Sequence, residues 1–323
     1  MMGLKTIGAA MTVAAIMLAG PAEAQTRVTL KAATAGSSYY LMTVQLAEAL
    51  RTATNGQISA TVEESQGSVQ NVREAPRRPG AFTFTSPPSL VRDAMANRAP
   101  FQEGTGFDQI RALWTMPPVT MHWVVRADSG IQSFEDLVGK SFVAGGRGTF
   151  TERSTRELFR RLGIEGRVTA PEVELGAAIA AMRNRQIDGF ASGSSHPAAN
   201  LQELAVGTPI RLLALNDALL AGLQEADPTV ARVVIPANTY QGVTTDTATI
   251  AIPVGMYGTT RMDDATAYEL TRIFWTRRAE MARANPWWNA VAPEQITSLQ
   301  IRLHPGAARY YAEAGIAIPD SLK

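Results

Sequence analysis

Four short segments rich in Gly, Ser and Thr carry the residue types best suited to hold a small anion. Each follows an apolar run and precedes a helical pattern, at positions 35–40, 65–69, 145–149 and 192–196. The first backbone N–H groups of a helix lack partners inside the helix, and the helix dipole is positive there, so such loops favour an anion. Each loop taken singly is more simply a helix cap and a turn. The four together favour a shared site for a small carboxylate.

Arg147 is the charged residue most suited to such a site. It lies between Gly146 and Gly148, just before a helical pattern that opens with Thr149 and Glu152 in capping-box spacing. Its guanidinium could grip a carboxylate through two parallel hydrogen bonds. The alternative is a solvated surface arginine.

Aromatic residues offer both pocket walls and packing anchors. Tyr39 and Tyr40 stand at the start of the first helical pattern, where Tyr39 could wall a pocket and Tyr40 fits the apolar face. We expect Tyr40 in the core. Trp287 and Trp288, which follow a proline, are expected to be packing anchors at a helix end.

Catalytic motifs are weak in this sequence. The segment 193–197 lacks the second Gly of a G-x-S-x-G nucleophile turn. Gly146-x-Gly148 begins like a dinucleotide loop, but Thr151 stands at the third Gly position. His122 lies between two apolar residues of an expected strand, which is more typical of a buried residue than of a catalyst. The sequence therefore does not favour an enzyme.

Composition excludes several classes of protein. The chain has 323 residues, of which 46% are hydrophobic and 18% charged, as in a globular protein of one large or two ordinary domains. Lys and Arg number 30 against 29 Asp and Glu, and this balance argues against a nucleic-acid binder. The absence of Cys excludes disulfides, thiolate zinc sites and iron–sulfur clusters, and there are only three His. We expect no metal or cofactor.

The first 24 residues have the features of a secretory signal peptide. Lys5 supplies a positive start, 7–19 is apolar, and an Ala-x-Ala cleavage motif ends at Ala24. The mature chain is expected to start at Gln25. No later run stays apolar for about 18 residues, the length that suggests a membrane helix. We expect a freely diffusing, exported protein of the periplasm.

Strand-like runs alternate with helical patterns along the rest of the chain. This alternation predicts α/β architecture, with parallel sheets and helices on both faces. The expected strands are 27–33, 57–63, 81–85, 110–115, 120–126, 141–144, 187–191, 209–215, 231–235 and 249–256, and the expected helices are 39–53, 149–163, 174–185, 263–284, 293–300 and 305–314, with another opening at Pro197.

Two extended stretches, 119–126 and 249–256, bracket a central block of the chain. A block inserted into a larger lobe needs two such crossings. The pattern therefore predicts two α/β lobes joined by two strands, with a ligand between them, because open α/β sheets bind ligands beyond the carboxyl ends of their strands.

Seven short motifs give the sequence a family resemblance from about residue 28 to residue 316. The chain resembles solute-binding receptors of the TAXI branch of tripartite ATP-independent periplasmic (TRAP) transporters, whose motifs occur here in the same order. They are TAGSSYY at 34–40, QGSVQNV at 66–72, VVRADSGI at 124–131 with DLVGK at 136–140, GRGT at 146–149, IDGF at 187–190, IPANTY at 235–240 and LHPGAARYY at 303–311.

The resemblance implies a fold and a division of the chain. The fold is that of a type II periplasmic binding protein, with two lobes that each hold a mainly parallel sheet flanked by helices and are joined by two hinge strands. Residues 25–120 and 255–323 would form the first lobe, and 121–254 the second.

The resemblance also implies a function and a set of contacts. The protein would be a monomeric receptor that closes on a small anionic ligand, an organic acid or an acidic amino acid, and delivers it to inner-membrane TRAP subunits. The implied ligand-binding positions are Ser37, Ser38, Tyr39, Tyr40, Gly67, Ser68, Asn71, Thr85, Ser86, Arg147, Gly148, Thr149, Ser194, His196 and Tyr240.

Two departures from the family pattern bear on the ligand. The segment 76–80, Pro-Arg-Arg-Pro-Gly, replaces an acidic stretch, and its prolines should shorten the preceding helix. Arg147 replaces a Ser in the Gly-rich turn. Both changes add positive charge near the expected site and favour a ligand with more negative charge.

An exported α/β enzyme acting on a small carboxylate is the alternative function. A structural or adhesion protein ranks third, because strand–helix alternation disfavours it. Neighbouring genes for a large membrane protein would favour the receptor over the enzyme.

Overall fold

The computed structural model of the chain describes residues 25–35, 37–147, 149–171 and 175–323. The expected signal peptide and Gly148 lie outside these residues. No helix within them is long and apolar enough to cross a membrane.

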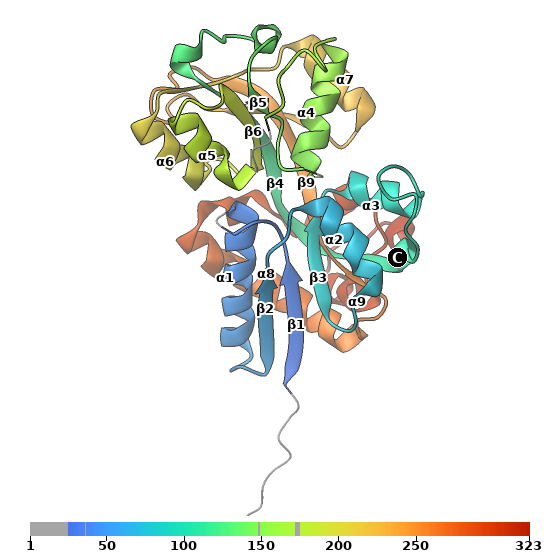
Figure 1. Ribbon diagram of the computed structural model, residues 1–323. Coiled ribbons are helices and arrows are strands. Elements are labelled where there is room, and N and C mark those ends of the chain that lie inside the picture. The colour runs from blue at the N-terminus through green and yellow to red at the C-terminus, as the bar shows by residue number, and fades with distance from the viewer. Residues whose placement is uncertain (1–24, 36, 148, 172–174) are drawn as a thin grey trace, which may run out of the picture.

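The chain forms two lobes that are joined by two long strands (Figure 1). These strands, β4 (Ile110–Arg126) and β9 (Thr247–Thr259), pass through both lobes and pair antiparallel between residues 110–120 and 251–259. They coincide with the two extended stretches that the sequence predicted as crossings.

Each lobe combines strands with covering helices. Lobe 1 holds β1 (Thr26–Lys31), β2 (Ile58–Glu63), β3 (Phe82–Ser86), α1 (Ser38–Ala53), α2 (Ser68–Glu74), α3 (Pro88–Met95), α8 (Asp264–Ala284) and α9 (Pro305–Glu313). Lobe 2 holds β5 (Phe142–Val143), β6 (Gly189–Ser194), β7 (Ile210–Leu212), β8 (Ala231–Ile235), α4 (Phe150–Arg161), α5 (Leu175–Arg183), α6 (Ala199–Gly207) and α7 (Asp217–Ala226).

The sheets of the two lobes differ in strand direction. In lobe 1, β1 is parallel to both β2 and β3, as predicted, and the pairing of β3 with the hinge strand β9 is antiparallel. In lobe 2 only β5 and β6 pair in parallel, whereas β4 is antiparallel to β6 and β7, and β8 is antiparallel to β9. The prediction of a mainly parallel sheet is therefore wrong for lobe 2. The hinge strands themselves continue into its sheet, and a strand–helix pattern does not reveal which strands they will join.

β4 also replaces two predicted strands, 110–115 and 120–126. It runs unbroken for 17 residues, but its register against β9 shifts between Ala112 and Trp114 and between Met116 and Val119. The second shift spans Pro117 and Pro118. Proline has no N–H to donate to a ladder, so it interrupts the pairing without ending the strand.

Local signals fixed the ends of several helices. The side chains of Ser37, Thr149 and Asp263 accept hydrogen bonds from the first turns of α1, α4 and α8. Helix α2 ends at Glu74 and passes into a 3-10 turn, Ala75–Arg77, that contains Pro76. The predicted shortening by proline is confirmed.

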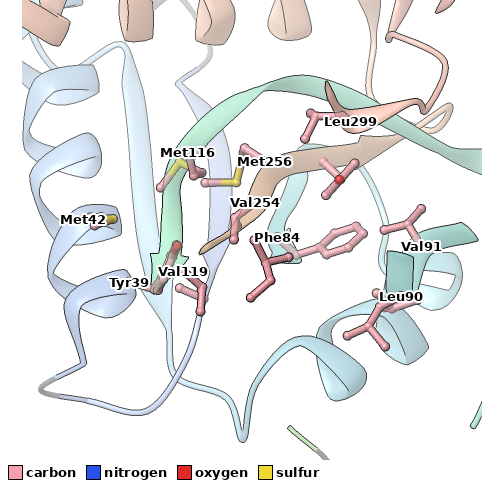
Figure 2. Packing of buried hydrophobic residues seen from close by; sticks show 14 of the residues in the cluster. Tyr39, Met42, Phe84, Leu90, Val91, Met116, Val119, Val254, Met256 and Leu299 are labelled. Atoms are coloured by element: carbon pink, nitrogen blue, oxygen red, sulfur yellow. The ribbon is translucent and has the colours of Figure 1, made fainter. Parts of the chain in front are cut away.

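Two apolar clusters stabilise the fold. The larger one extends from lobe 1 along the hinge strands into lobe 2, and Figure 2 shows its part around Met116, Val254 and Met256. Trp288 is fully buried in it, with its ring 5.7 Å from that of Phe274, so its predicted role as a packing anchor is confirmed. The smaller cluster lies in lobe 2 and includes side chains of α5 and α6.

Polar contacts also join the lobes beside the hinge. Arg153 of α4 pairs with Asp93 of α3 at 3.2 Å and donates to the carbonyl oxygen of Ala99. Arg92 of α3 lies 3.7 Å from Asp227, just after α7. These partly exposed pairs are individually weak, but they show that the lobes touch at α3.

Candidate ligand-binding cleft

A cavity of about 520 Å³ lies between the two lobes. Its size fits a small molecule, since ligand pockets typically measure roughly 300–1,000 Å³. Lobe 1 and the hinge contribute Ala32, Ala33, Thr34, Ala35, Ser37, Tyr39, Glu64, Gln66, Gly67, Ser68, Thr85, Pro87, Val119 and Val254, and lobe 2 contributes Gly146, Arg147, Thr149, Phe150, Thr151, Gly176 and Gly193.

Two helix N-termini meet at this cavity from opposite lobes. Helix α1 begins at Ser38 and α4 at Phe150. Within the described residues, the N–H groups of the lining residues Tyr39, Phe150 and Thr151 have no hydrogen-bond partner. The cavity therefore has partnerless donors and the positive ends of two helix dipoles, which favour an anion.

Two buried hydroxyl groups add to these donors. Thr85 is 3% exposed and Thr151 is 8% exposed, and both line the cavity. Neither hydroxyl has a hydrogen-bond partner in the described part of the chain. A Cβ placed on Gly193 would lie 2.4 Å from Oγ1 of Thr151, so the glycine leaves room for this hydroxyl. Buried polar groups normally find partners, and a bound ligand would supply them here.

The cavity has few charged lining residues, and these are exposed to solvent. Among its described lining residues only Glu64 and Arg147 are charged, and both are exposed. Oε1 of Glu64 accepts a hydrogen bond of 2.9 Å from the N–H of Ala35, which ties this loop to the end of β2. Arg147 makes no ion pair or hydrogen bond within the described residues.

The comparisons with known proteins agree with this architecture. The profile of the NMT1-like family matches residues 30–315, nearly all of the chain beyond the expected signal peptide. The chain belongs to the NMT1-like family.

Two solved structures show the same fold as this NMT1-like chain. MatC from Rhodopseudomonas palustris, solved with bound malate, aligns with a TM-score of 0.58 at 13% identity over 90% of this chain and 97% of its own. The periplasmic binding protein BugD aligns with a TM-score of 0.55 at 15% identity over 90% and 98%. The predicted class, a two-lobed α/β fold of type II periplasmic binding proteins, is confirmed.

About half of the ligand-binding positions implied by the resemblance line the cavity of this NMT1-like chain. Those that do are Ser37, Tyr39, Gly67, Ser68, Thr85, Arg147 and Thr149. Those that do not are Ser38, Tyr40, Asn71, Ser86, Ser194, His196 and Tyr240, and Gly148 lies outside the described residues. Three of the four predicted loops thus converge, and the fourth contributes only Gly193.

Of the two adjacent tyrosines, only Tyr39 lies where it was expected. Tyr39 is buried, lines the cavity and donates its hydroxyl hydrogen to the carbonyl oxygen of Pro117. Tyr40 is half-buried and outside the apolar clusters, so its predicted core position is wrong. The cap at Ser37 sets the rotation of α1, which buries Tyr39 together with Met42 and residues further along the same face.

Asn71 and Ser86 hold the loops around the cavity without lining it. Nδ2 of Asn71 donates to the carbonyl oxygens of Ala32 at 2.6 Å and Thr85 at 3.0 Å, so it ties the end of β1 to β3. The hydroxyl of Ser86 donates to the carbonyl oxygen of Pro87. Both are therefore positioning residues in this structure.

His196 and Tyr240 belong to a separate hydrogen-bond network on β4. Thr120 Oγ1 and His196 Nδ1 are 2.8 Å apart, and the Tyr240 hydroxyl lies 2.8 Å from Nε2 of His122. Tyr240 also accepts from the N–H of Ala198. Thr120 follows Val119 on an extended strand, and successive side chains point to opposite faces. The network therefore lies on the other face of β4 from the cavity.

Burial keeps this network neutral. It lowers the pKa of His122 to about 4, with a further lowering from His196, and raises the pKa of Tyr240 to about 12. Because Nδ1 of His122 faces the carbonyl oxygen of Thr120 at 3.0 Å, it donates, and Nε2 accepts from Tyr240. The expectation that His122 is a buried residue is confirmed.

The segment 76–80 brings no charge into the cavity. Arg78 pairs with Glu63 and stacks over the ring of Phe82, 4.7 Å from its centre. Arg77 is exposed and does not line the cavity either. Of the positive charges expected at the site, only that of Arg147 lies at the cavity among the described residues.

The polar lining residues missing from the predicted ligand-binding positions are Thr34, Glu64, Gln66 and Thr151, of which Gln66 belongs to a predicted loop. Thr151 stands two residues after a helix cap, a position whose backbone was expected at the site, and Glu64 directly precedes the second Gly/Ser loop. Within the described residues, no group of three His, Asp or Glu side chains could hold a metal ion.

Proposed function

We propose that the chain is a periplasmic receptor that binds a small carboxylate-bearing ligand between its lobes and delivers it to TRAP membrane subunits. The observation that carries this proposal is the meeting of the α1 and α4 N-termini at one cavity, where their partnerless N–H groups adjoin the hydroxyls of Thr85 and Thr151. A carboxylate accepts about four hydrogen bonds and gains from both helix dipoles.

The TRAP assignment rests on the seven motifs that resemble TAXI receptors. The two-lobed fold and the hinge strands are consistent with closure around a ligand. We place the lobes at 25–120 with 255–323 and at 121–254. Membrane subunits would use an ion gradient to transport the released ligand, and the receptor would act as a monomer.

We infer that the receptor does not transform its ligand. The described cavity lining holds hydroxyl groups but no His, and the nearby His122 and His196 are engaged on the other face of β4. A hydroxyl nucleophile needs an adjacent base. Incubation with a bound carboxylate should return it unchanged, as mass spectrometry would show.

Ligand binding is tested by thermal shift and titration calorimetry with small organic acids and amino acids. A true ligand raises the melting temperature in proportion to the logarithm of its concentration once it exceeds the Kd. The matched variants are Thr85→Val, which removes a cavity hydroxyl, and Thr83→Val on the same strand, whose hydroxyl donates to Thr29 outside the cavity. Only Thr85→Val should weaken binding; equal effects would contradict the site.

Export and closure have separate tests. N-terminal sequencing of the periplasmic protein should begin at Gln25, and an intact Met1 on soluble protein would refute the signal peptide. Small-angle scattering should show a smaller radius of gyration with ligand than without, and an unchanged radius would count against closure.

Delivery is tested with the membrane subunits in vesicles. Uptake of the ligand should need this chain and an ion gradient, and it should persist without ATP. Uptake driven by ATP alone would contradict the TRAP assignment while leaving the binding site intact.

A further inference from the structure

We propose that the ligand carries one carboxylate and an apolar body, rather than two carboxylates. This inference rests on the proposed receptor function and specifies the class of ligand for the same cavity.

The charges around the cavity match a single anionic group. Arg147 is the one cation among the described lining residues, and Glu64 is the one anion. A second carboxylate would have no further cation to pair with, and near lobe 1 it would face Glu64. Enclosing an unpaired charge costs far more than enclosing an apolar group, so the cavity disfavours a dicarboxylate.

The donors also match one carboxylate. Thr85 from lobe 1 and Thr151 from lobe 2 are the lining hydroxyls that are more than nine-tenths buried and lack partners in the described residues. Together with the first N–H groups of α1 and α4, they are enough donors for the two oxygens of one carboxylate. Other lining hydroxyls are partly used for capping, as in Ser37 and Thr149.

Much of the rest of the cavity wall is apolar, and its other polar side chains are those of Thr34, Gln66 and Ser68. Val119 and Val254 come from the two hinge strands and are almost fully buried, and Figure 2 shows Tyr39 of α1 beside Val119. The remaining apolar lining residues are Ala32, Ala33, Ala35, Pro87 and Phe150. A methylene chain or a branched apolar group would be buried against these side chains, whereas a second polar end would lose its water there.

The experiment compares ligands that differ only at the far end. Pentanoate is glutarate with one carboxylate replaced by methyl, and norvaline is glutamate changed in the same way. In whichever pair binds to the cavity, calorimetry should show that the methyl-terminated compound binds about tenfold more tightly than the dicarboxylate. In the series from propanoate to heptanoate, affinity should rise about fourfold per methylene until the cavity is filled.

Variants locate the two ends of the ligand. Val119→Thr places a hydroxyl in the apolar wall and should weaken pentanoate by about fivefold while leaving glutarate less affected. Val254→Thr repeats the test from the other hinge strand if Val119→Thr lowers the melting temperature of the protein too far for the binding measurement. Thr85→Val removes a carboxylate donor and should weaken both compounds by about the same factor, about fivefold.

The possible outcomes distinguish failure of this inference from failure of the proposed receptor function. Tighter binding of glutarate or glutamate than of its methyl-terminated partner overturns the single-carboxylate ligand and leaves the carboxylate receptor standing. Failure of every carboxylate to bind overturns the receptor proposal, and this inference with it. A flat response to chain length overturns the apolar body alone.

Discussion

The cavity between the lobes and the network on the other face of β4 are both built from buried polar side chains, but they differ in their partners. In the network, Thr120, His122 and Tyr240 bond to one another, to His196 or to the backbone. In the cavity, the hydroxyls of Thr85 and Thr151 have no partner in the described residues. The cavity and the network lie on opposite faces of β4, because Val119 of this strand lines the cavity and Thr120 belongs to the network.

This difference separates polar groups that stabilise the fold from those that wait for a ligand. A satisfied buried group contributes to folding, and its loss leaves partners unpaired. An unsatisfied group in a cavity lowers stability until a ligand completes it. Variants in the network should therefore change unfolding and spare binding, and variants in the cavity should do the reverse.

The largest expected effect is the pH dependence of the network. The pKa of His122 falls from 6.5 to about 4 on folding, because burial and His196 disfavour its charged form. The unfolded chain therefore binds a proton that the folded chain does not, and the free energy of unfolding should fall by about 3 kcal/mol as pH drops from 6.5 to 4. Urea unfolding across this range measures the slope.

His122→Gln is the control for this slope, because Gln keeps one donor and one acceptor but does not titrate. Burial also lowers the pKa of His196 and His304, which contribute in the same direction. The difference between wild type and His122→Gln isolates His122. Parallel curves for the two proteins would show that the network does not hold His122 neutral.

Asn71 links the two regions of the comparison, because its buried Nδ2 donates to the backbone of the cavity residue Thr85, although its Oδ1 has no partner in the described residues. Asn71→Ala should lower the free energy of unfolding by about 2–3 kcal/mol, since two buried carbonyl oxygens lose a donor. It should also weaken ligand binding, because Thr85 loses its restraint. Arg73→Ala on the exposed side of α2 is the control. Lost stability with unchanged affinity would show that Thr85 does not depend on Asn71.

Tyr240→Phe tests the network alone. The ring still packs in lobe 2, but the Ala198 N–H and Nε2 of His122 lose their partner. We expect a loss of about 1–2 kcal/mol in the free energy of unfolding with unchanged ligand affinity, measured by urea unfolding and calorimetry. Weakened binding at unchanged stability would place Tyr240 in the site after all.

Arg147 gives the smallest expected effect. A buried, bidentate arginine would change affinity by about ten- to a hundredfold, but Arg147 is exposed at the cavity edge, so Arg147→Ala should weaken a carboxylate ligand by only about two- to fivefold. Arg147→Lys should recover most of this, and salt should suppress it. A loss of about a hundredfold would show that closure buries the guanidinium.

The sequence by itself determined the order of the strands, most of the helices and many of their ends, although it did not predict α3 or α7. Caps at Ser37, Thr149 and Asp263, and the proline at position 76, act through hydrogen bonds and dihedral angles of neighbouring residues. Local chemistry of this kind can be read without knowing what packs nearby. The same local signals identified three of the loops that converge at the cavity.

Only the tertiary structure decided which of these residues share a site. The pairing of β4 with β6, β7 and β9 fixed the directions of the sheet in lobe 2 and turned Val119 toward the cavity and Thr120 away from it. Arg78 pairs with Glu63 of β2 instead of lining the cavity. Pairing and burial depend on residues far apart in the chain, so spacing along the sequence cannot specify them.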